Sequence, residues 1–322
     1  MRIGVDIMGG DFAPVAPIEG ALLAAAHLGE RATVVLIGDE AIIRKELEAR
    51  GHNPEAFSIV HTDQAIGMDE SPTKAVVSKP RATINMGIGM VKQGQLDGFV
   101  SAGNTGAMLV ASVMGLGKIE GVMRPTIGVM VEIGGGKKAL LCDVGANVDC
   151  KPEVLFQFGL LAKVYLESVH KLEDPRIGLL NVGEEEGKGP DVVKATYSLM
   201  KSTDRYRFVG NVEGRDIYRG HADAFICDGF TGNIVLKFGE SMYELLKGRF
   251  PGDSFIETFN FENYGGVPVL GVKGISIIGH GISTAKATES MILSAVTAAE
   301  SGLVGKIEAA FASSQSDSPI IV

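Results

Sequence analysis

Short apolar runs alternate with segments of helical period along almost the whole chain, and this alternation limits the fold more than any other feature. Strands are expected at residues 3–7, 33–37, 57–61, 98–101, 177–181, 208–211, 224–227 and 274–278. Helices are expected at residues 14–28, 41–50, 74–92, 105–116, 152–169, 190–200, 233–247 and 282–299. Strands joined by helices pair in parallel, because a long crossover is needed to start the next strand at the same edge. The sequence therefore predicts an α/β fold of three layers, with a mostly parallel sheet between two layers of helices.

Two runs break the alternation because too few residues separate them for a helix. Residues 127–131 and 139–143 flank a glycine-rich turn at 134–137, so we expect a β-hairpin. The hairpin should belong to a central lobe of roughly residues 120–240, intertwined with a first lobe in one unit over residues 1–322. A cleft between two lobes is the usual position of a small-molecule site.

The composition excludes several classes of protein. A formal net charge of −9 leaves no basic surplus for the phosphates of a nucleic acid. Three cysteines without a CxxC pair indicate neither a disulfide framework nor a zinc site. The N-terminus lacks a signal-peptide pattern, and a polar turn at 102–106 divides the uncharged stretch 98–117. We therefore expect a soluble, cytoplasmic protein.

Four predicted strand ends share one pattern, in which a turn of Gly with Asn, Asp or Thr leads into a helix. These turns lie at residues 6–11, 101–106, 181–187 and 228–233. The carboxyl ends of parallel strands meet at one edge of the sheet, where ligands of such folds bind. Helix N-termini there offer free N–H groups and a partial positive charge, which suits a small anion such as phosphate.

Familiar catalytic motifs are missing from these turns. The sequence contains no GxxxxGK[ST], no GxGxxG after the first strand, no GxSxG and no HExxH. Asp143, Asp149 and Asp228 form no tight acidic cluster in the sequence and are expected to be solvated or capping carboxylates. We therefore expect no metal and no organic cofactor.

Read as whole phrases, the turns and their flanks resemble one family. The matching phrases are DIMGGD (6–11), SAGNTGA (101–107), LCDVGANVDCKP (141–152), LLNVGEEEG (179–187), GNVEGRDI (210–217), CDGFTGNIVLK (227–237) and YGGVPVLGV (264–272). They resemble the phosphate acyltransferase (PlsX) family from the first strand to the last helix.

The resemblance implies transfer of a long-chain fatty acyl group from acyl carrier protein to inorganic phosphate. The product, acyl phosphate, would serve phospholipid (phosphatidic acid) synthesis through a membrane-bound glycerol-3-phosphate acyltransferase. The resemblance also implies a homodimer with a fold like that of isocitrate/isopropylmalate dehydrogenases and phosphotransacetylase. Any attachment to the membrane would be peripheral and made through a partner.

The chain departs from the family pattern in two places. Lys79-Pro80-Arg81-Ala82-Thr83 stands where the family commonly has Lys-Lys-Asp-Ser-Ser. A short bridge at 250–263 replaces a longer helical hairpin, so we expect no amphipathic membrane-binding helix there.

The turns supply the candidate site residues. The candidate catalytic residues are Asn104, Thr105, Lys79 and Asp228. The candidate phosphate- and substrate-binding residues are Gly9, Gly10, Asp11, Gly103, Gly106, Asn147, Lys151, Gly183, Glu184, Thr231, Gly232, Asn233 and His280. Structural roles compete with these assignments: a helix cap for Asn104, and a surface charge for Lys79, Arg81 or Lys151.

Two other functions fit the same fold expectation. A nicotinamide-dependent decarboxylating dehydrogenase would need a divalent metal and several arginines around a hydroxy acid, which the sequence does not display. A catalytically inactive carrier-binding regulator is the second alternative. For a carrier protein, the basic residues between Lys201 and Arg219 are the expected docking patch, with an ordinary solvated face as the competing interpretation.

Overall fold

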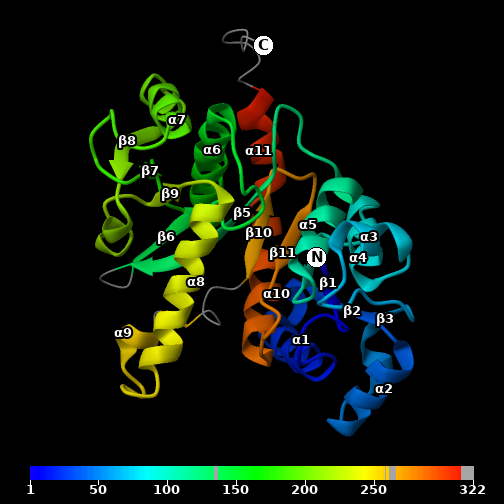
Figure 1. Ribbon diagram of the computed structural model, residues 1–322. Helices are drawn as coiled ribbons and strands as arrows, with labels where there is room; N and C mark the ends of the chain where they lie inside the picture. Colours follow the sequence, from blue (N-terminus) through cyan, green and yellow to red (C-terminus); the bar gives the residue numbers. More distant parts are fainter. Residues whose placement is uncertain (134–136, 258, 261–265, 313–322) are drawn as a thin grey trace. The chain divides into compact units, whose positions relative to one another are not determined.

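The computed structural model describes residues 1–133, 137–257, 259–260 and 266–312. The chain divides into two compact units (Figure 1). Unit 1 contains Met1–Gly117 and Glu262–Val304, and unit 2 contains Lys118–Phe261 and Gly305–Val322.

Unit 1 is built on a sheet whose strand order is β3-β2-β1-β4-β11-β10. All neighbouring strands are parallel except β10, which runs antiparallel to β11. The strands are β1 (Arg2–Asp6), β2 (Thr33–Gly38), β3 (Ser58–His61), β4 (Gly98–Ser101), β10 (Val267–Leu270) and β11 (Ile275–Ile278). The helices are α1 (Val15–Leu28), η1 (Gly29–Arg31), α2 (Glu40–Ala49), η2 (Pro54–Ala56), α3 (Pro72–Ser78), α4 (Thr83–Lys92), α5 (Thr105–Ala111), the π-helical turn η3 (Ser112–Leu116) and α10 (Ala285–Glu300).

The direction of the crossovers sorts these helices onto two faces. The chain moves from β1 to β2 to β3 through α1 and α2, then reverses to β4 through α3 and α4. Right-handed crossovers therefore place α1 and α2 on one face and α3 and α4 on the other. Helix α10 packs against α1 (Figure 1), where a side chain at Gly20 would overlap Thr288.

Unit 2 contains five strands in the order β5-β6-β9-β7-β8. The first pair is antiparallel and the others are parallel. The strands are β5 (Thr126–Ile133), β6 (Lys137–Cys142), β7 (Arg176–Leu180), β8 (Arg207–Val212) and β9 (Ala224–Ile226). The helices are α6 (Pro152–Val169), α7 (Asp191–Lys201), η4 (Gly214–Arg219), α8 (Gly229–Leu246), α9 (Ser254–Glu257) and, across the boundary between the units, α11 (Leu303–Ala312).

Unit 2 is also layered. Helices α6 and α7 pack together. They connect β6 to β7 and β7 to β8, in one direction along the strand order, whereas η4 leads from β8 back to β9. Helix α8 contacts β6 and lies against η4, since a side chain at Gly239 would lie 3.1 Å from the Tyr218 hydroxyl. The α/β class, the mostly parallel pairing and the hairpin of β5 and β6 are thus confirmed. The centre of the predicted hairpin turn lies outside the described residues.

Several boundaries differ from expectation. The helical stretches predicted around 74–92 are the two helices α3 and α4, which are separate because Pro80 cannot continue the first. Helix α8 begins at Gly229, before the predicted residue 233, and α10 begins at Ala285, after the predicted residue 282. Strand β10 was not predicted, because it is four residues long and contains Pro268. Within the described ranges, the helices are too short or too polar to cross a bilayer.

Helix α4 lies unusually close to the sheet, and one glycine permits this. A side chain at Gly87 would overlap the ring of Phe99, which is fully buried, whereas Gly89 on the same helix has open space around it. Replacing an exposed helical Gly by Ala stabilises by up to about 1 kcal/mol, and overpacking a core costs about 1–3 kcal/mol.

We therefore predict opposite effects from two substitutions two residues apart. Gly89→Ala should raise the free energy of unfolding by about 0.5–1 kcal/mol, and Gly87→Ala should lower it by about 2 kcal/mol. Urea unfolding of both variants measures this difference. Equal stability of the two variants would show that α4 moves away from the sheet without penalty.

Candidate functional site

A buried carboxylate organises the carboxyl edge of the unit 1 sheet. Asp6, at the end of β1, accepts hydrogen bonds from the Ser101 hydroxyl (2.7 Å) and from the Met8 backbone N–H (3.0 Å). Ser101 in turn accepts one from the Gly103 N–H (3.0 Å). Burial raises the pKa of Asp6, although these hydrogen bonds act in the opposite direction. A side chain at Gly9 would lie 2.5 Å from the Asp6 carboxylate, so Gly9 and Gly103 shape the turns.

Asn104 caps α5 and also fixes a neighbouring loop. Its side-chain oxygen accepts from the Ala107 N–H (3.0 Å). Its amide nitrogen donates to the carbonyls of Gly67 (3.2 Å), Met68 (3.1 Å) and Glu70 (3.0 Å). The side chain therefore directs its donors at the loop, and a catalytic role of Asn104 through this amide would require these bonds to break. The next residue, Thr105, is exposed.

Lys79, which follows α3, is hydrogen-bonded to the same loop. Its ammonium group donates to the Ala65 carbonyl (2.9 Å) and to the Glu70 carboxylate (2.5 Å). The hydrogen bonds from Lys79 and from the Gly67 N–H hold the pKa of Glu70 below its usual range. The charge of Lys79 is thus already balanced by a carboxylate, which weakens its candidacy as a phosphate ligand.

The turns after β1 and β11 lie together in unit 1. The Asp11 N–H donates to the Gly281 carbonyl (2.7 Å), and Gly10 takes a positive φ of 100° beside it. His280 accepts at Nδ1 from the Ile282 N–H (3.3 Å). The structure therefore brings Gly10, Asp11 and His280 to one place, as the sequence predicts for strand ends. Gly106 instead faces Pro72 and allows α5 to pack on α3.

A second buried carboxylate organises the corresponding edge of unit 2. Asp143 is fully buried and accepts from the backbone N–H groups of Gly145 (3.2 Å), Ala146 (3.1 Å) and Asn147 (2.7 Å). The Asn147 side-chain amide donates to Asp143 (2.9 Å) and to the Pro125 carbonyl (2.9 Å). The amides of this turn thus bind a carboxylate of the protein itself, and Asn147 has no amide hydrogen left for a substrate.

The start of α8 packs directly on this turn. The Gly229 N–H donates to the Asn147 carbonyl (2.7 Å), and the Asn233 amide donates to the Val144 carbonyl (3.2 Å). A side chain at Gly232 would overlap the main-chain oxygen of Asp143. Gly232 and Asn233 therefore have packing roles that compete with the predicted phosphate binding.

Asp228 is the N-cap of α8. Its carboxylate accepts from the N–H (2.8 Å) and the hydroxyl (2.9 Å) of Thr231. This capping role competes with the proposed catalytic role of Asp228, because a catalytic carboxylate would have to break its two hydrogen bonds to Thr231.

Two cations lie at this edge. Lys151 is exposed at the N-cap position of α6. Arg124 is exposed and donates to the Asp149 carbonyl (3.4 Å). Arg124 was not among the site residues predicted from the sequence, although the predicted hairpin indicates its position at this edge. A strand antiparallel to β6 begins where β6 ends, so the residues before β5 must lie at the carboxyl edge.

The turn after β7 carries Gly183 and Glu184. Glu184 is exposed and lies 3.9 Å from the Arg215 guanidinium, which also pairs with Glu213 at 2.9 Å. Gly183 is buried beside Glu185 and Lys188. The Glu184 carboxylate thus lies beside a cation of the protein itself, Arg215.

The expected carrier-docking patch is largely neutralised. Lys201 pairs with Glu186 (2.7 Å), Arg207 with Asp174 (3.5 Å) and Arg219 with Asp216 (3.6 Å). Arg205 donates to the Ala310 carbonyl (2.5 Å). The basic residues of this segment therefore offer little surplus charge to an acidic partner, and we do not retain the patch.

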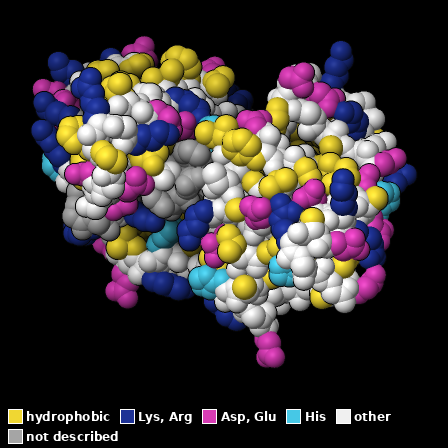
Figure 2. Space-filling model, turned by 90° about the horizontal axis from the view of Figure 1, so that it is seen from below, with side chains coloured by type: hydrophobic (Ala, Val, Ile, Leu, Met, Phe, Trp, Pro, Cys, Tyr) yellow, Lys and Arg dark blue, Asp and Glu magenta, His cyan; other side chains and the backbone are white. Residues whose placement is uncertain are grey.

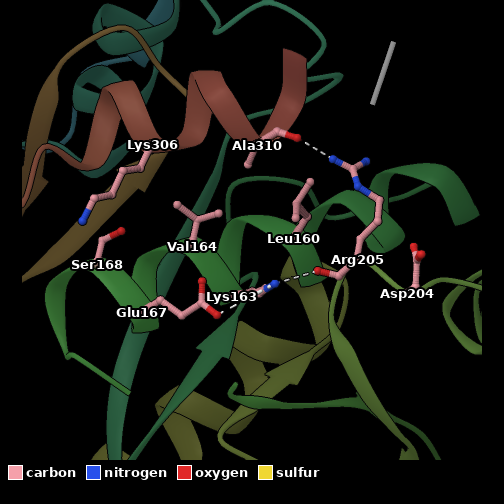
Figure 3. A pocket seen from close by; sticks show the side chains of 9 residues that line it. All are labelled: Leu160, Lys163, Val164, Glu167, Ser168, Asp204, Arg205, Lys306 and Ala310. Atoms are coloured by element: carbon pink, nitrogen blue, oxygen red, sulfur yellow. Dashed lines mark hydrogen bonds and ion pairs between the residues drawn. The ribbon is translucent and has the colours of Figure 1, made fainter. Parts of the chain in front are cut away.

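A hollow of about 580 Å³ lies between α6, the loop before β8 and α11 (Figure 3). Lys163 crosses its floor and donates to the Arg205 carbonyl (2.9 Å). The hollow is lined by the second half of α6, whereas the candidate site residues lie at the beginning of that helix. It is therefore separate from the edge that carries Lys151.

The three thiols are poor nucleophiles. Burial raises the pKa of Cys142 and of Cys227, which are both almost fully buried. Burial and the neighbouring Asp143 and Asp228 raise the pKa of Cys150 to about 12. Because the thiolate is the reactive form, a cysteine-bound acyl intermediate is not supported.

The role of Asn104 can be separated from simple capping. Asp and Asn are equivalent caps, but Asn104→Asp would place a carboxylate against three carbonyl oxygens. We predict that Asn104→Asp lowers the free energy of unfolding by about 2–4 kcal/mol. Asn53→Asp is the matched control, because Asn53 caps η2 with its side-chain oxygen. Wild-type stability of Asn104→Asp, or a large loss of turnover without loss of stability, would contradict the loop-fixing role.

The thiols give a second prediction. With a pKa of about 12, Cys150 carries roughly one thiolate in 10⁴ to 10⁵ molecules near neutral pH. Iodoacetamide should therefore leave activity unchanged below pH 8, and labelling should rise only as the pH approaches the pKa. Rapid inactivation at pH 7 that is lost in Cys150→Ser would show a reactive thiol.

The chain is similar to a known family over most of its length. A family model described as "Fatty acid synthesis protein" matches residues 1–251. A phosphate acyltransferase of Salinibacter ruber is 43% identical, over 97% of this chain and 98% of its own. One of Dictyoglomus turgidum is 39% identical, over 91% of this chain and 92% of its own.

Solved structures support the fold. A phosphotransacetylase from Streptococcus pyogenes superposes with a TM-score of 0.64 at 19% identity, covering 93% of this chain and 94% of its own. A branched-chain phosphotransacylase from Enterococcus faecalis gives a TM-score of 0.60 at 14% identity, covering 93% and 99%. The predicted phosphotransacetylase-like fold is confirmed. The long matches to the curated relatives show that the chain belongs to the phosphate acyltransferase family.

Proposed function

We propose that this protein transfers a fatty acyl group from a thioester to inorganic phosphate, giving acyl phosphate for phospholipid synthesis. The observation that carries the proposal is the match to phosphate acyltransferases over about nine-tenths of the chain at 39–43% identity. The fold agrees, because the phosphotransacetylase structures share it.

The chemistry needs no nucleophile from the protein. A phosphate oxygen attacks the thioester carbonyl, the new carbon–oxygen bond forms a tetrahedral intermediate, and the carbon–sulfur bond then breaks. The electron pair leaves with sulfur, which takes a proton from solvent or a nearby acid. Phosphate is already anionic at neutral pH, so catalysis consists mainly of positioning and charge stabilisation. The raised thiol pKa values support direct attack by phosphate.

In unit 2, we assign Lys151 and Arg124 to the phosphate. Both are exposed cations at the carboxyl edge, beside the start of α8. Asp228 and Thr231 keep that helix start in place through their mutual hydrogen bonds. In unit 1, Thr105 and the turn containing Gly10, Asp11 and His280 remain the proposed substrate contacts.

We further propose that the acyl donor is acyl carrier protein and that the protein works as a homodimer in the cytoplasm. A membrane-bound glycerol-3-phosphate acyltransferase would consume the product. Acyl phosphates carry an apolar chain and a reactive anhydride, so transfer to a nearby membrane partner would limit hydrolysis. These assignments rest on the family's chemistry.

The test is release of the carrier thiol from hexadecanoyl acyl carrier protein with and without phosphate. We predict release that requires phosphate, saturates with it and is unaffected by EDTA, because the sequence lacks a metal-ligand motif. Arg124→Ala and Lys151→Ala should each raise the KM for phosphate about tenfold, as loss of a charged contact does. Lys92→Ala is the control, since Lys92 is an exposed cation at the end of α4. Thiol release independent of phosphate would identify a thioesterase, and conversion of a hydroxy acid with NAD would favour the dehydrogenase.

A further inference from the structure

The hollow of unit 2 carries polar groups that the proposed reaction does not use. Its volume is about 580 Å³, and its lining comes from α6, from the loop before β8 and from α11 (Figure 3). All of the lining residues belong to the segments Lys118–Phe261 and Gly305–Val322, which form unit 2. Small-molecule sites in proteins have volumes of about 300–1,000 Å³. The hollow is therefore large enough for a ligand of its own.

The floor of the hollow is one face of α6. Lining residues recur between Leu160 and Ser168 at the three- and four-residue spacing of a single helical face. The distance from Leu160 to Ser168 along the helix axis is about 12 Å at 1.5 Å per residue. Leu160 and Val164, with Ala310 of α11 above them in Figure 3, supply the apolar part of the lining. A short alkyl chain has the length and the polarity of this floor.

Ser168 holds a buried hydroxyl group at the hollow. Only 2% of the residue is exposed, yet its side chain lines the hollow. The hydroxyl forms no hydrogen bond within the part of the chain that the structure describes, whereas the Ser168 carbonyl accepts from the Lys171 ammonium group (2.7 Å). Buried polar groups nearly always have a hydrogen-bond partner in the protein, in water or in a ligand. The Ser168 hydroxyl therefore indicates a polar ligand at this end of the hollow.

Lys306 of α11 supplies a cation beside it. Lys306 is exposed, and among the described residues no carboxylate lies within ion-pair distance of its ammonium group. This differs from the face of the molecule in Figure 2, where basic side chains are interspersed with acidic ones. In a chain with 39 acidic and 30 basic residues, most cations find such a partner. The charge of Lys306 is therefore available to an anion.

The two ends of the hollow differ in charge. Figure 3 shows the Lys306 side chain extending toward Ser168 at one end, whereas Asp204 lies at the other end. Glu167 also lines the hollow, but it lies 3.8 Å from the Lys163 ammonium group, which offsets its charge. An anionic group held by Lys306 and Ser168 would therefore avoid the Asp204 carboxylate, with the apolar residues between the two ends.

We propose that this hollow is a second binding site, for an amphiphilic anion with one carboxylate or phosphate head and an alkyl chain of about eight carbons. The head accepts hydrogen bonds from Lys306 and Ser168, and the chain lies on Val164 and Leu160. An extended alkyl chain advances about 1.3 Å per carbon from ordinary C–C bond lengths, so a head and about eight carbons span the floor. The proposal does not depend on the proposed reaction, because the candidate residues of the carboxyl edges do not line the hollow.

Isothermal titration calorimetry tests the chemistry of the ligand. Octanoate and octyl phosphate, below their micellar concentrations, should bind saturably. Octylammonium, with the opposite charge, and butanoate, with a chain too short to cover the floor, should each bind at least about tenfold more weakly. Tighter binding of octyl phosphate would assign the site to phosphate esters, and tighter binding of octanoate would assign it to carboxylates. Equal binding of octylammonium, or no binding of either anion, would overturn the proposal.

Two matched pairs of variants test the position of the ligand. Lys306→Glu should weaken octanoate binding about tenfold or more, whereas Lys45→Glu, the same change at an exposed lysine within α2, should leave it unchanged. Ala310→Leu fills part of the hollow and should also weaken binding about tenfold, whereas Ala309→Leu, at an exposed neighbour outside the lining, should not. Wild-type affinity in either Lys306→Glu or Ala310→Leu would contradict the proposal.

Hydrogen exchange separates this site from the proposed phosphate site. Octanoate should slow the exchange of backbone amides in residues 203–206 and 305–312 and leave the turn at 145–151 unchanged. Ser168→Ala should weaken this effect about tenfold in octanoate concentration, because the charged head loses a hydrogen bond. Protection of 145–151 instead, abolished by Lys151→Ala, would place the anion at the carboxyl edge. That result would overturn this proposal and leave the proposed function intact.

Discussion

The hydrogen bonds to the Asp143 carboxylate are the interaction on which the rest of unit 2 depends. Four donors from residues 145–147 surround this fully buried side chain. Each donor left without an acceptor would cost about 1–3 kcal/mol, so the turn has one favoured conformation. Asp6 performs the equivalent task at the end of β1 in unit 1, where it joins the turns after β1 and β4.

The position of α8 follows from the turn that Asp143 fixes. Glycines at 229 and 232 let the start of the helix touch the turn, because a side chain at either position would approach Asn147 or overlap Asp143. One packing constraint thereby places the start of α8 against the turn that continues to Lys151.

Much of this arrangement could be predicted from the sequence. The alternation of strands and helices predicted the mostly parallel pairing of strands, and the shared pattern at strand ends predicted that Gly10 and Asp11 would lie at the carboxyl edge of the sheet. The family could be predicted from long phrases around the same turns. The sequence could not predict which polar groups make hydrogen bonds within the protein and are therefore unavailable to a ligand. Asn104, Lys79 and Asn147 match an anion site by residue type, but their donors are directed at carbonyls and carboxylates from distant segments. Arg124 lacked a motif, and only the antiparallel pairing of β5 places it at the edge.

The central claim is that phosphate itself becomes part of the product. The most direct measurement uses phosphate labelled with heavy oxygen and mass analysis of the acyl product from hexadecanoyl acyl carrier protein. The account predicts hexadecanoyl phosphate that retains all of the heavy oxygens, with the labelled oxygen bridging carbon and phosphorus. Unlabelled hexadecanoic acid as the first product, or an acylated protein formed before phosphate is added, would contradict it.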